Sequence, residues 1–318
     1  MAATAIANIV VPKIFSPYVV ERSTTLSNIL SSGIAQRTPA FDEMAGAKGK
    51  LFEMPYFNDL SGSAEVLADG TALTINNITA EQETAVKFMR GKAWGATDLA
   101  AAVAGEDIMA SIGDMVAAYW ARSVQTTLMN ILGALFHDSA GSIWSTHVND
   151  TTATDITSSA VVDTMQLLGD NASSLTTMIV HSATYAALQK ASLISFVRDA
   201  DNNIMFSTYL GKRLIVDDSC ATSGSGGTTE YRTYIFGDGA FAYGVGSIDN
   251  ATEVDRDTLK GEDILINRQH FILHPRGLKF VGSVAGASPT DGEVGAGADW
   301  TQVWDSQNIK MVCLIAGV

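Results

Sequence analysis

The sequence predicts an α+β fold in which a long helix lies beside extended strands and an α/β region follows. Three patterns carry this prediction. Apolar residues recur at three- and four-residue steps from Glu106 to Phe136, and two strand-like segments flank a long polar stretch at 58–84. Helical and strand patterns then alternate from about residue 150 to 245, which is typical of an α/β unit.

Composition limits the classes of protein to consider. The 318 residues include 34 acidic and 20 basic side chains, a net charge of −14, and charged residues make up 17% of the chain against about 25% in typical domains. A 47% apolar content supports a folded core, while the acidic balance argues against a basic nucleic-acid-binding face or binding to an anionic membrane surface. The sequence has no apolar run of about 18 residues and no signal segment. We therefore expect either a large core or a surface that other copies cover.

Residues 1–40 are predicted to form an arm rather than a domain. Pro12, Pro17 and Pro39 interrupt regular structure, and the segment is too short to bury a core of its own. A short helix is expected from Ser23 to Ile34. Basic residues exceed acidic ones by two in this arm, with Lys13, Arg22 and Arg37 against Glu21.

Residues 41–100 are predicted to form an extended hairpin. The segments 50–57 and 84–95 have strand patterns, and the residues between them are rich in Gly, Ser, Asp, Asn and Thr. This polar stretch has no lysine or arginine but contains five acidic residues: Asp59, Glu65, Asp69, Glu81 and Glu83. An isolated hairpin is only marginally stable in water. The predicted hairpin is therefore either a solvent-exposed surface loop or an arm that lies on a neighbouring subunit.

The later elements follow in order. The periodic segment 106–136 predicts a helix about 45 Å long. The α/β region predicts helices at 158–168 and 182–190, the second capped by Ser182, and strands at 176–181, 212–218, 231–236 and 240–243. An acidic polar stretch, 249–263, then leads to a long strand at 264–274, a resumed strand from 279, a Gly/Ala linker at 283–298 and a last strand at 310–316.

Motifs for catalysis, cofactors and metals are absent or broken. The segment Gly237–Ala242 fits G-x-G-x-x-G/A, but strand and turn residues follow it where a helix is required, so it predicts a tight turn. His270 and His274 lie on an expected strand without an acidic third ligand, and Cys220 and Cys313 are too few for a four-ligand zinc site. There is no P-loop, nucleophile elbow or H-E-x-x-H. We therefore expect no enzyme, no cofactor and no metal site.

A dense charge cluster surrounds Arg256. The cluster is either a solvated loop or part of an ion-pair network between subunits. In such a network the Arg256 guanidinium would make two hydrogen bonds to a carboxylate, and Arg268 and Arg276 would supply further cations. Together with the arm and the hairpin, this cluster defines the candidate assembly residues. They are Arg22, Arg37, Asp59, Glu65, Asp69, Glu81, Glu253, Arg256, Asp257, Arg268 and Arg276.

The order of the segments resembles the major capsid proteins of tailed bacteriophages, which have the HK97-type shell fold. Six local stretches carry the resemblance, in the order of that family: 93–100, 104–109, 118–122, 180–188, 209–218 and 272–277. The resemblance implies an N-arm (1–40), an E-loop hairpin (41–100), a spine helix and the start of a peripheral domain (101–149), an axial domain (150–246), and a return to the peripheral domain with the C-terminal strand (247–318).

The resemblance also implies a function. Copies are expected to assemble in the host cytoplasm into hexamers and pentamers of an icosahedral virion shell around double-stranded DNA, with no sequence-specific DNA binding, and with a separate scaffolding protein, a portal and a decoration protein as partners. Some members cross-link their shells through an E-loop lysine, and 58–84 has none, so we expect a shell held non-covalently. The alternatives are an encapsulin-type cellular nanocompartment, a cytosolic α/β enzyme and another virion structural protein.

Overall fold

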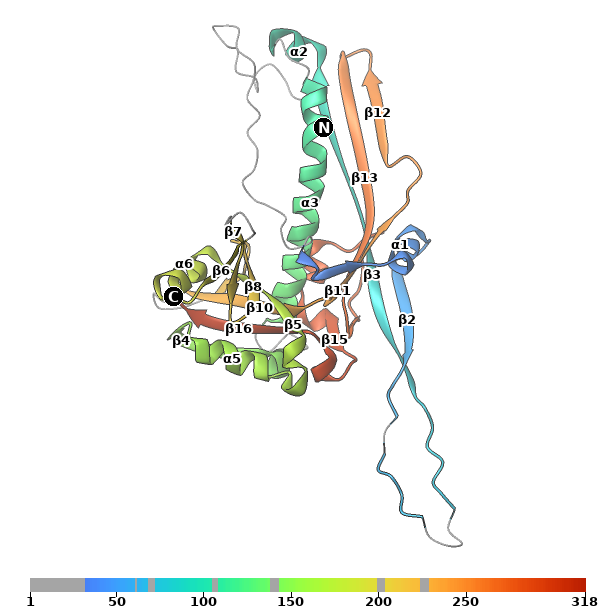
Figure 1. The fold of residues 1–318 in the computed structure, drawn as a ribbon. Coiled ribbons are helices and arrows are strands. Elements are labelled where there is room, and N and C mark those ends of the chain that lie inside the picture. The colour runs from blue at the N-terminus through green and yellow to red at the C-terminus, as the bar shows by residue number, and fades with distance from the viewer. Residues whose placement is uncertain are drawn as a thin grey trace.

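The computed structural model describes residues 32–60, 62–67, 72–104, 108–137, 143–198, 204–223 and 229–318. In Figure 1 the long helix α3 (Ile108–Leu135) runs beside two long strands, a smaller α/β body lies to one side, and the β2–β3 hairpin extends away from both. The α+β prediction is confirmed. Most of residues 1–40, with the helix expected at 23–34, lies outside the described residues.

One sheet forms the long part of the molecule. Its strands, in spatial order, are β1 (Ala35–Arg37), β11 (Phe241–Gly246), β13 (Glu262–Pro275), β3 (Ala80–Thr97) and β2 (Leu51–Phe57), with β12 (Thr252–Asp257) on the free edge of β13. Strand β3 changes partner along its length, because it pairs with β2 up to Val86 and with β13 from Lys87 onward. The hairpin is therefore continuous with the sheet.

Helix α1 (Pro39–Gly46) packs closely against β11. The contact depends on glycine, because a Cβ built on Gly244 would lie 2.3 Å from the backbone of Phe41. Helix α2 (Asp98–Ala104) directly follows β3.

The second sheet forms the α/β body. Its strands, in spatial order, are β4 (Val148–Asp155), β16 (Met311–Gly317), β10 (Glu230–Gly237), β5 (Leu175–Val180), β8 (Lys212–Val216), β7 (Ile204–Tyr209) and β6 (Ser195–Arg198), with β9 (Thr222–Ser223) paired to β10. Helices α5 (Ser158–Gln166) and α6 (Ser182–Lys190) pack on one face through Val161 and Leu188. Tyr234 and Phe236 on β10 belong to the core cluster that also contains the buried side chains of α3.

The C-terminal half of α3 lies in the core that joins the two parts. The apolar side chains that recur at helical spacing are buried there, namely Val124, Leu128, Ile131, Leu132 and Leu135. The same core contains the stacked rings of Phe88 on β3 and Phe271 on β13, whose centroids lie 5.1 Å apart. Burial of one helix stripe against both sheets fixes their relative position.

Short elements complete the chain. They are α4 (Trp144–His147), the 3₁₀ turns η3 (Gly169–Ser174), η4 (Gly297–Asp299) and η5 (Ser306–Asn308), helix α7 (Asp291–Val294), and the paired strands β14 (Leu278–Phe280) and β15 (Trp300–Gln302). Among the described residues, no helix is long and apolar enough to cross a membrane.

The acidic stretch contains a strand, because β12 forms along the exposed edge of β13. Two local predictions are wrong. The Gly/Ala linker contains α7, which begins with a capping box between Thr290 and Glu293. Helix α6 is capped by the side chain of His181, which accepts a hydrogen bond from the backbone of Ala183, and not by Ser182.

The C-terminal strand lies in a different sheet from the one expected from its place in the sequence. We expected 310–316 with the return to the long part, whereas β16 lies inside the second sheet between β4 and β10. Conversely, β11 was grouped with the α/β region and pairs instead with β1 and β13. Thus β16 lies in the second sheet and β11 lies in the first, although their positions in the sequence suggested the reverse. The domain boundaries given above remain a proposal.

Candidate assembly surfaces

The tip of the β2–β3 hairpin exposes large apolar side chains. Val66 is 93% exposed and Ile75 is 89% exposed, and the other large apolar side chains exposed in the described part of 57–78 are Phe57, Leu60, Leu67, Leu73 and Ile78. In Figure 1 this segment extends far beyond both sheets. Apolar clusters of this kind on a projecting segment are typical of surfaces that a partner covers.

The acidic residues of the tip remain at the surface. Glu65 accepts a hydrogen bond from the backbone of Thr74 at 3.1 Å, and the hydrogen bonds from Thr74 lower the pKa of Glu65. Asp59 accepts from the backbone of Leu60 at 2.7 Å. Asp69 lies outside the described residues. The tip is therefore both apolar and acidic.

Tyr56 ties the base of the hairpin to the body. Its hydroxyl lies 2.8 Å from the carbonyl oxygen of Val303 and 3.1 Å from a carboxylate oxygen of Glu81. The other carboxylate oxygen of Glu81 accepts from the side-chain amide of Asn58 at 3.2 Å. Glu81, a predicted assembly residue, thus braces its own hairpin while remaining exposed.

Glu83 differs from the other acidic residues of the hairpin because it is buried. One carboxylate oxygen accepts from the backbone of Gly277 at 2.9 Å, and the other lies 3.4 Å from Nε2 of His274 and 4.0 Å from Arg276. Burial alone would raise the pKa of Glu83, but His274, Arg276 and the Gly277 hydrogen bond outweigh it and lower that pKa. Burial also lowers the pKa of His274. Glu83 opposes this shift, so the carboxylate and the imidazole influence each other's protonation.

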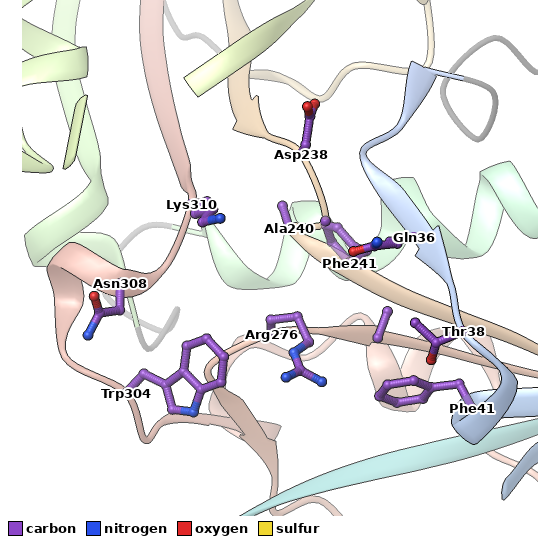
Figure 2. Close-up of a pocket in the computed structure, with 12 residues that line it drawn as sticks. Gln36, Thr38, Phe41, Asp238, Ala240, Phe241, Arg276, Trp304, Asn308 and Lys310 are labelled. Carbon is purple, nitrogen blue, oxygen red and sulfur yellow. The ribbon is translucent and has the colours of Figure 1, made fainter. Parts of the chain in front are cut away.

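Arg276 lines a cleft of about 280 Å³ beside this cluster. Figure 2 shows its guanidinium between the rings of Trp304 and Phe41, whose centroids lie 5.2 and 5.8 Å from it, a spacing that allows cation–π attraction. Lys310 and Asp238 lie on the far side of the cleft. The cleft contains both charge signs and three aromatic rings, those of Phe41, Phe241 and Trp304, so it offers ionic and apolar contacts for docking.

The cations of the outer edge are paired within the subunit. Arg256 forks onto Asp98 at 2.6 Å and Asp263 at 2.7 Å, and these partners raise the pKa of Arg256. Arg268 pairs with Glu253 across β12 and β13.

The remaining candidate pairs are also internal. Asp257 pairs with Lys260 at 3.3 Å, and Arg37 pairs with Asp42 at 3.0 Å. Arg22 lies outside the described residues. A role for these residues between subunits stays a prediction, because each described pair already satisfies its charges inside one chain.

Sequence reasoning missed several residues of these surfaces. Asp98, Trp304 and Lys310 gave no signal, because their partners lie far away in the chain. The exposed Val66 and Ile75 were visible as apolar residues inside a polar stretch and could have been singled out. Among the described residues, no group of His, Cys, Asp or Glu side chains is arranged to hold a metal ion.

The architecture defines a class of protein: a shell protein of the HK97 type, with a spine helix, an α/β body and a projecting hairpin. The comparisons identify the family. A model of the Gp13-like family, described as major capsid protein 13-like, matches residues 43–317. The chain belongs to this family of phage major capsid proteins.

Individual relatives agree with this assignment. The chain is 41% identical over 316 residues to the major capsid protein of Bacillus phage SPP1, covering 98% of both chains. Among solved structures it is similar to the capsid of cyanophage Pam1 (TM-score 0.64, 12% identity, 99% and 98% coverage) and of Ralstonia phage GP4 (0.64, 8%, 96% and 96%), which shows a shared fold.

The family match and the relatives establish the class of protein to which the chain belongs. The chain is a phage major capsid protein and hence a component of the virion, and it is a structural protein rather than an enzyme. The capsid prediction is confirmed over the nanocompartment and enzyme alternatives. Because a capsid is built from multiple copies of its major protein, the chain associates with itself.

Proposed function

We propose that the chain forms hexamers and pentamers of an icosahedral shell around double-stranded DNA, in which the β2–β3 hairpin of each subunit lies on a neighbour. The observation that carries this proposal is the exposed apolar tip, with Val66 at 93% and Ile75 at 89% exposure on a segment that has no core of its own. Covering these side chains removes apolar surface from water and stabilises the assembled state.

The α/β body offers a second contact. The β6–β7 hairpin at its edge exposes Phe196, Val197, Ile204 and Met205. We assign this edge to contacts around the centre of each hexamer or pentamer, where copies meet head to tail.

The shell is held without covalent bonds. The segment 58–84 has no lysine that could form an amide cross-link with a neighbouring side chain. Mature particles boiled in denaturant should therefore give a single band of the subunit mass on a gel. A ladder of covalent multimers would contradict this part of the proposal.

The enclosed DNA is not held by specific contacts. A net charge of −14 gives little attraction for phosphates, so DNA is free to slide during packaging. A scaffolding protein, a portal and a decoration protein complete the assembly, which takes place in the host cytoplasm.

The apolar tip is tested by a double substitution, Val66→Ser with Ile75→Ser. The matched control is Val162→Ser, which removes a half-exposed apolar side chain from α5, away from the hairpin. Sedimentation and electron microscopy should find shells for the wild type and the control, and free capsomers or subunits for the double variant. Shells of the double variant at wild-type yield would contradict the role of the hairpin.

A further inference from the structure

A second cleft lies between the spine helix and the α/β body. It has a volume of about 720 Å³, within the range of about 300–1,000 Å³ typical of ligand pockets. Five parts of the chain line it: the last turns of α3, the loop after β8, strand β9, strand β10 and helix α7 with the residues after it. None of the predicted assembly residues lines this cleft.

Arg232 on β10 is the main charge of the cleft. Only 8% of the residue is exposed, and its Nε atom is buried without a hydrogen-bond partner. No described carboxylate lies within 4.0 Å of its guanidinium. A guanidinium is always charged, and a buried charge without a counter-ion is destabilising. An anion in the cleft would remove this cost.

The other charged groups of the cleft do not supply that anion. Asp291 on α7 is the acidic residue of the lining, and its Oδ1 atom is bound by Arg90 at 3.0 Å and by the Thr127 hydroxyl at 3.3 Å. His137 also lines the cleft, at the end of α3. Neutral donors are available on the walls, including the amide of Asn130.

Two glycines line the cleft at positions where the surrounding atoms leave room for a side chain. Gly133 lies inside α3, where glycine costs about 1 kcal/mol relative to alanine, yet a Cβ built there would meet no atom within 4 Å. At Gly292 on α7 the nearest atom to such a Cβ is the Thr290 hydroxyl at 3.9 Å. Side chains are thus missing from walls where they would fit, which leaves room for a bound group.

We propose that this cleft is an oxyanion-binding site, in which Arg232 binds a carboxylate or phosphate group that enters between Gly133 and Gly292. The planar guanidinium suits both oxyanions, because its donors match a pair of acceptor oxygens. The bound group bridges the spine helix and the α/β body, so it stabilises their relative position. The carboxylate source is a peptide side chain, and the phosphate source is a free anion.

The experiment is isothermal titration of full-length assembled protein with two probes, inorganic phosphate and a capped Gly-Glu-Gly peptide, at constant ionic strength. Wild-type protein should bind at least one probe with one site per subunit. Arg232→Gln should weaken that binding about tenfold or more, as expected for loss of a charge-assisted hydrogen bond. Tighter binding of phosphate identifies a free anion as the ligand, and tighter binding of the peptide identifies a protein carboxylate.

Two variants separate the site from general charge and from misfolding. Arg213→Gln removes an arginine of β8 that lies over the ring of Phe206, outside the cleft, and should bind like the wild type. Gly133→Leu keeps Arg232 and the helix but fills the cleft, and should abolish binding. The proposal is overturned if the wild type binds neither probe, or if Arg232→Gln or Gly133→Leu binds as tightly as the wild type.

Discussion

Mild acid should destabilise the folded subunit through two buried histidines. His147 and His274 are both fully buried. Ring nitrogens of His147 lie 2.7 Å from the Thr146 hydroxyl and 2.9 Å from the carbonyl oxygen of Ser306. Burial lowers the pKa of both histidines below the usual 6.5. As the pH falls through this range, the two histidines therefore take up protons more readily in the unfolded chain than in the folded chain.

The size of the effect follows from proton linkage. A histidine that took up no proton when folded would reduce the free energy of unfolding by about 1.4 kcal/mol between pH 7.5 and 5.5, so the two together reduce it by at most about 3 kcal/mol. Glu83 does not contribute in this range, because its lowered pKa places its loss of stability below about pH 4.5. Ionised Glu83 stabilises the folded chain above about pH 4.5, and this stabilisation is lost as the pH falls through its lowered pKa.

Urea unfolding of the full-length protein at pH 7.5 and 5.5, followed by tryptophan fluorescence, measures this difference. His147→Gln and His274→Gln should each remove part of the loss and together most of it, while His270, whose pKa is also lowered by burial, accounts for the rest. His137→Gln, at an exposed position, is the control for replacing a histidine by glutamine. A double variant that loses as much stability in acid as the wild type would refute the reasoning.

Four substitutions test the packing by urea unfolding or soluble yield. Phe88→Ala should cost about 3–5 kcal/mol, because it empties a fully buried ring site; a cost below about 1 kcal/mol would contradict that packing. Glu83→Gln keeps an acceptor for the backbone of Gly277 but removes a charge that the fold stabilises, so we expect a loss of about 1–3 kcal/mol, and an unchanged midpoint would contradict it. Thr290→Ala removes a capping box and should cost about 1 kcal/mol. Gly244→Ala places a methyl group against α1 and should cost about 3 kcal/mol or more, seen as lost soluble protein; normal yield would contradict the close contact.

Elements whose signal is local could be predicted from the sequence. Helix α3 has apolar residues at helical spacing over eight turns, and the described helix agrees with the predicted one within two residues at each end. Strands β2 and β13 have patterns that depend only on their own residues. The capping box of α7 was also present as Thr290 and Glu293, three residues apart, and was overlooked among glycines and alanines.

Elements and contacts that depend on distant partners could not be predicted. Strand β12 has one large apolar residue, Val254, and is a strand because the long edge of β13 supplies its hydrogen bonds. The position of β16 between β4 and β10 is a property of topology, which its own residues do not encode. Glu83 was grouped with the solvated tip, although His274 and Arg276 surround it from nearly 200 positions along the chain.

The change of partner along β3 has a mechanical consequence. A force that pulls on the hairpin travels along the backbone of β3 into the segment from Lys87 to Thr97, where eleven residues pair with β13. The hydrogen bonds of an antiparallel ladder lie across the strands, so tension along the strand loads many of them at once and does not open them one by one. If the hairpin lies on a neighbouring subunit as proposed, internal pressure on the shell would load all the hydrogen bonds of this ladder in shear.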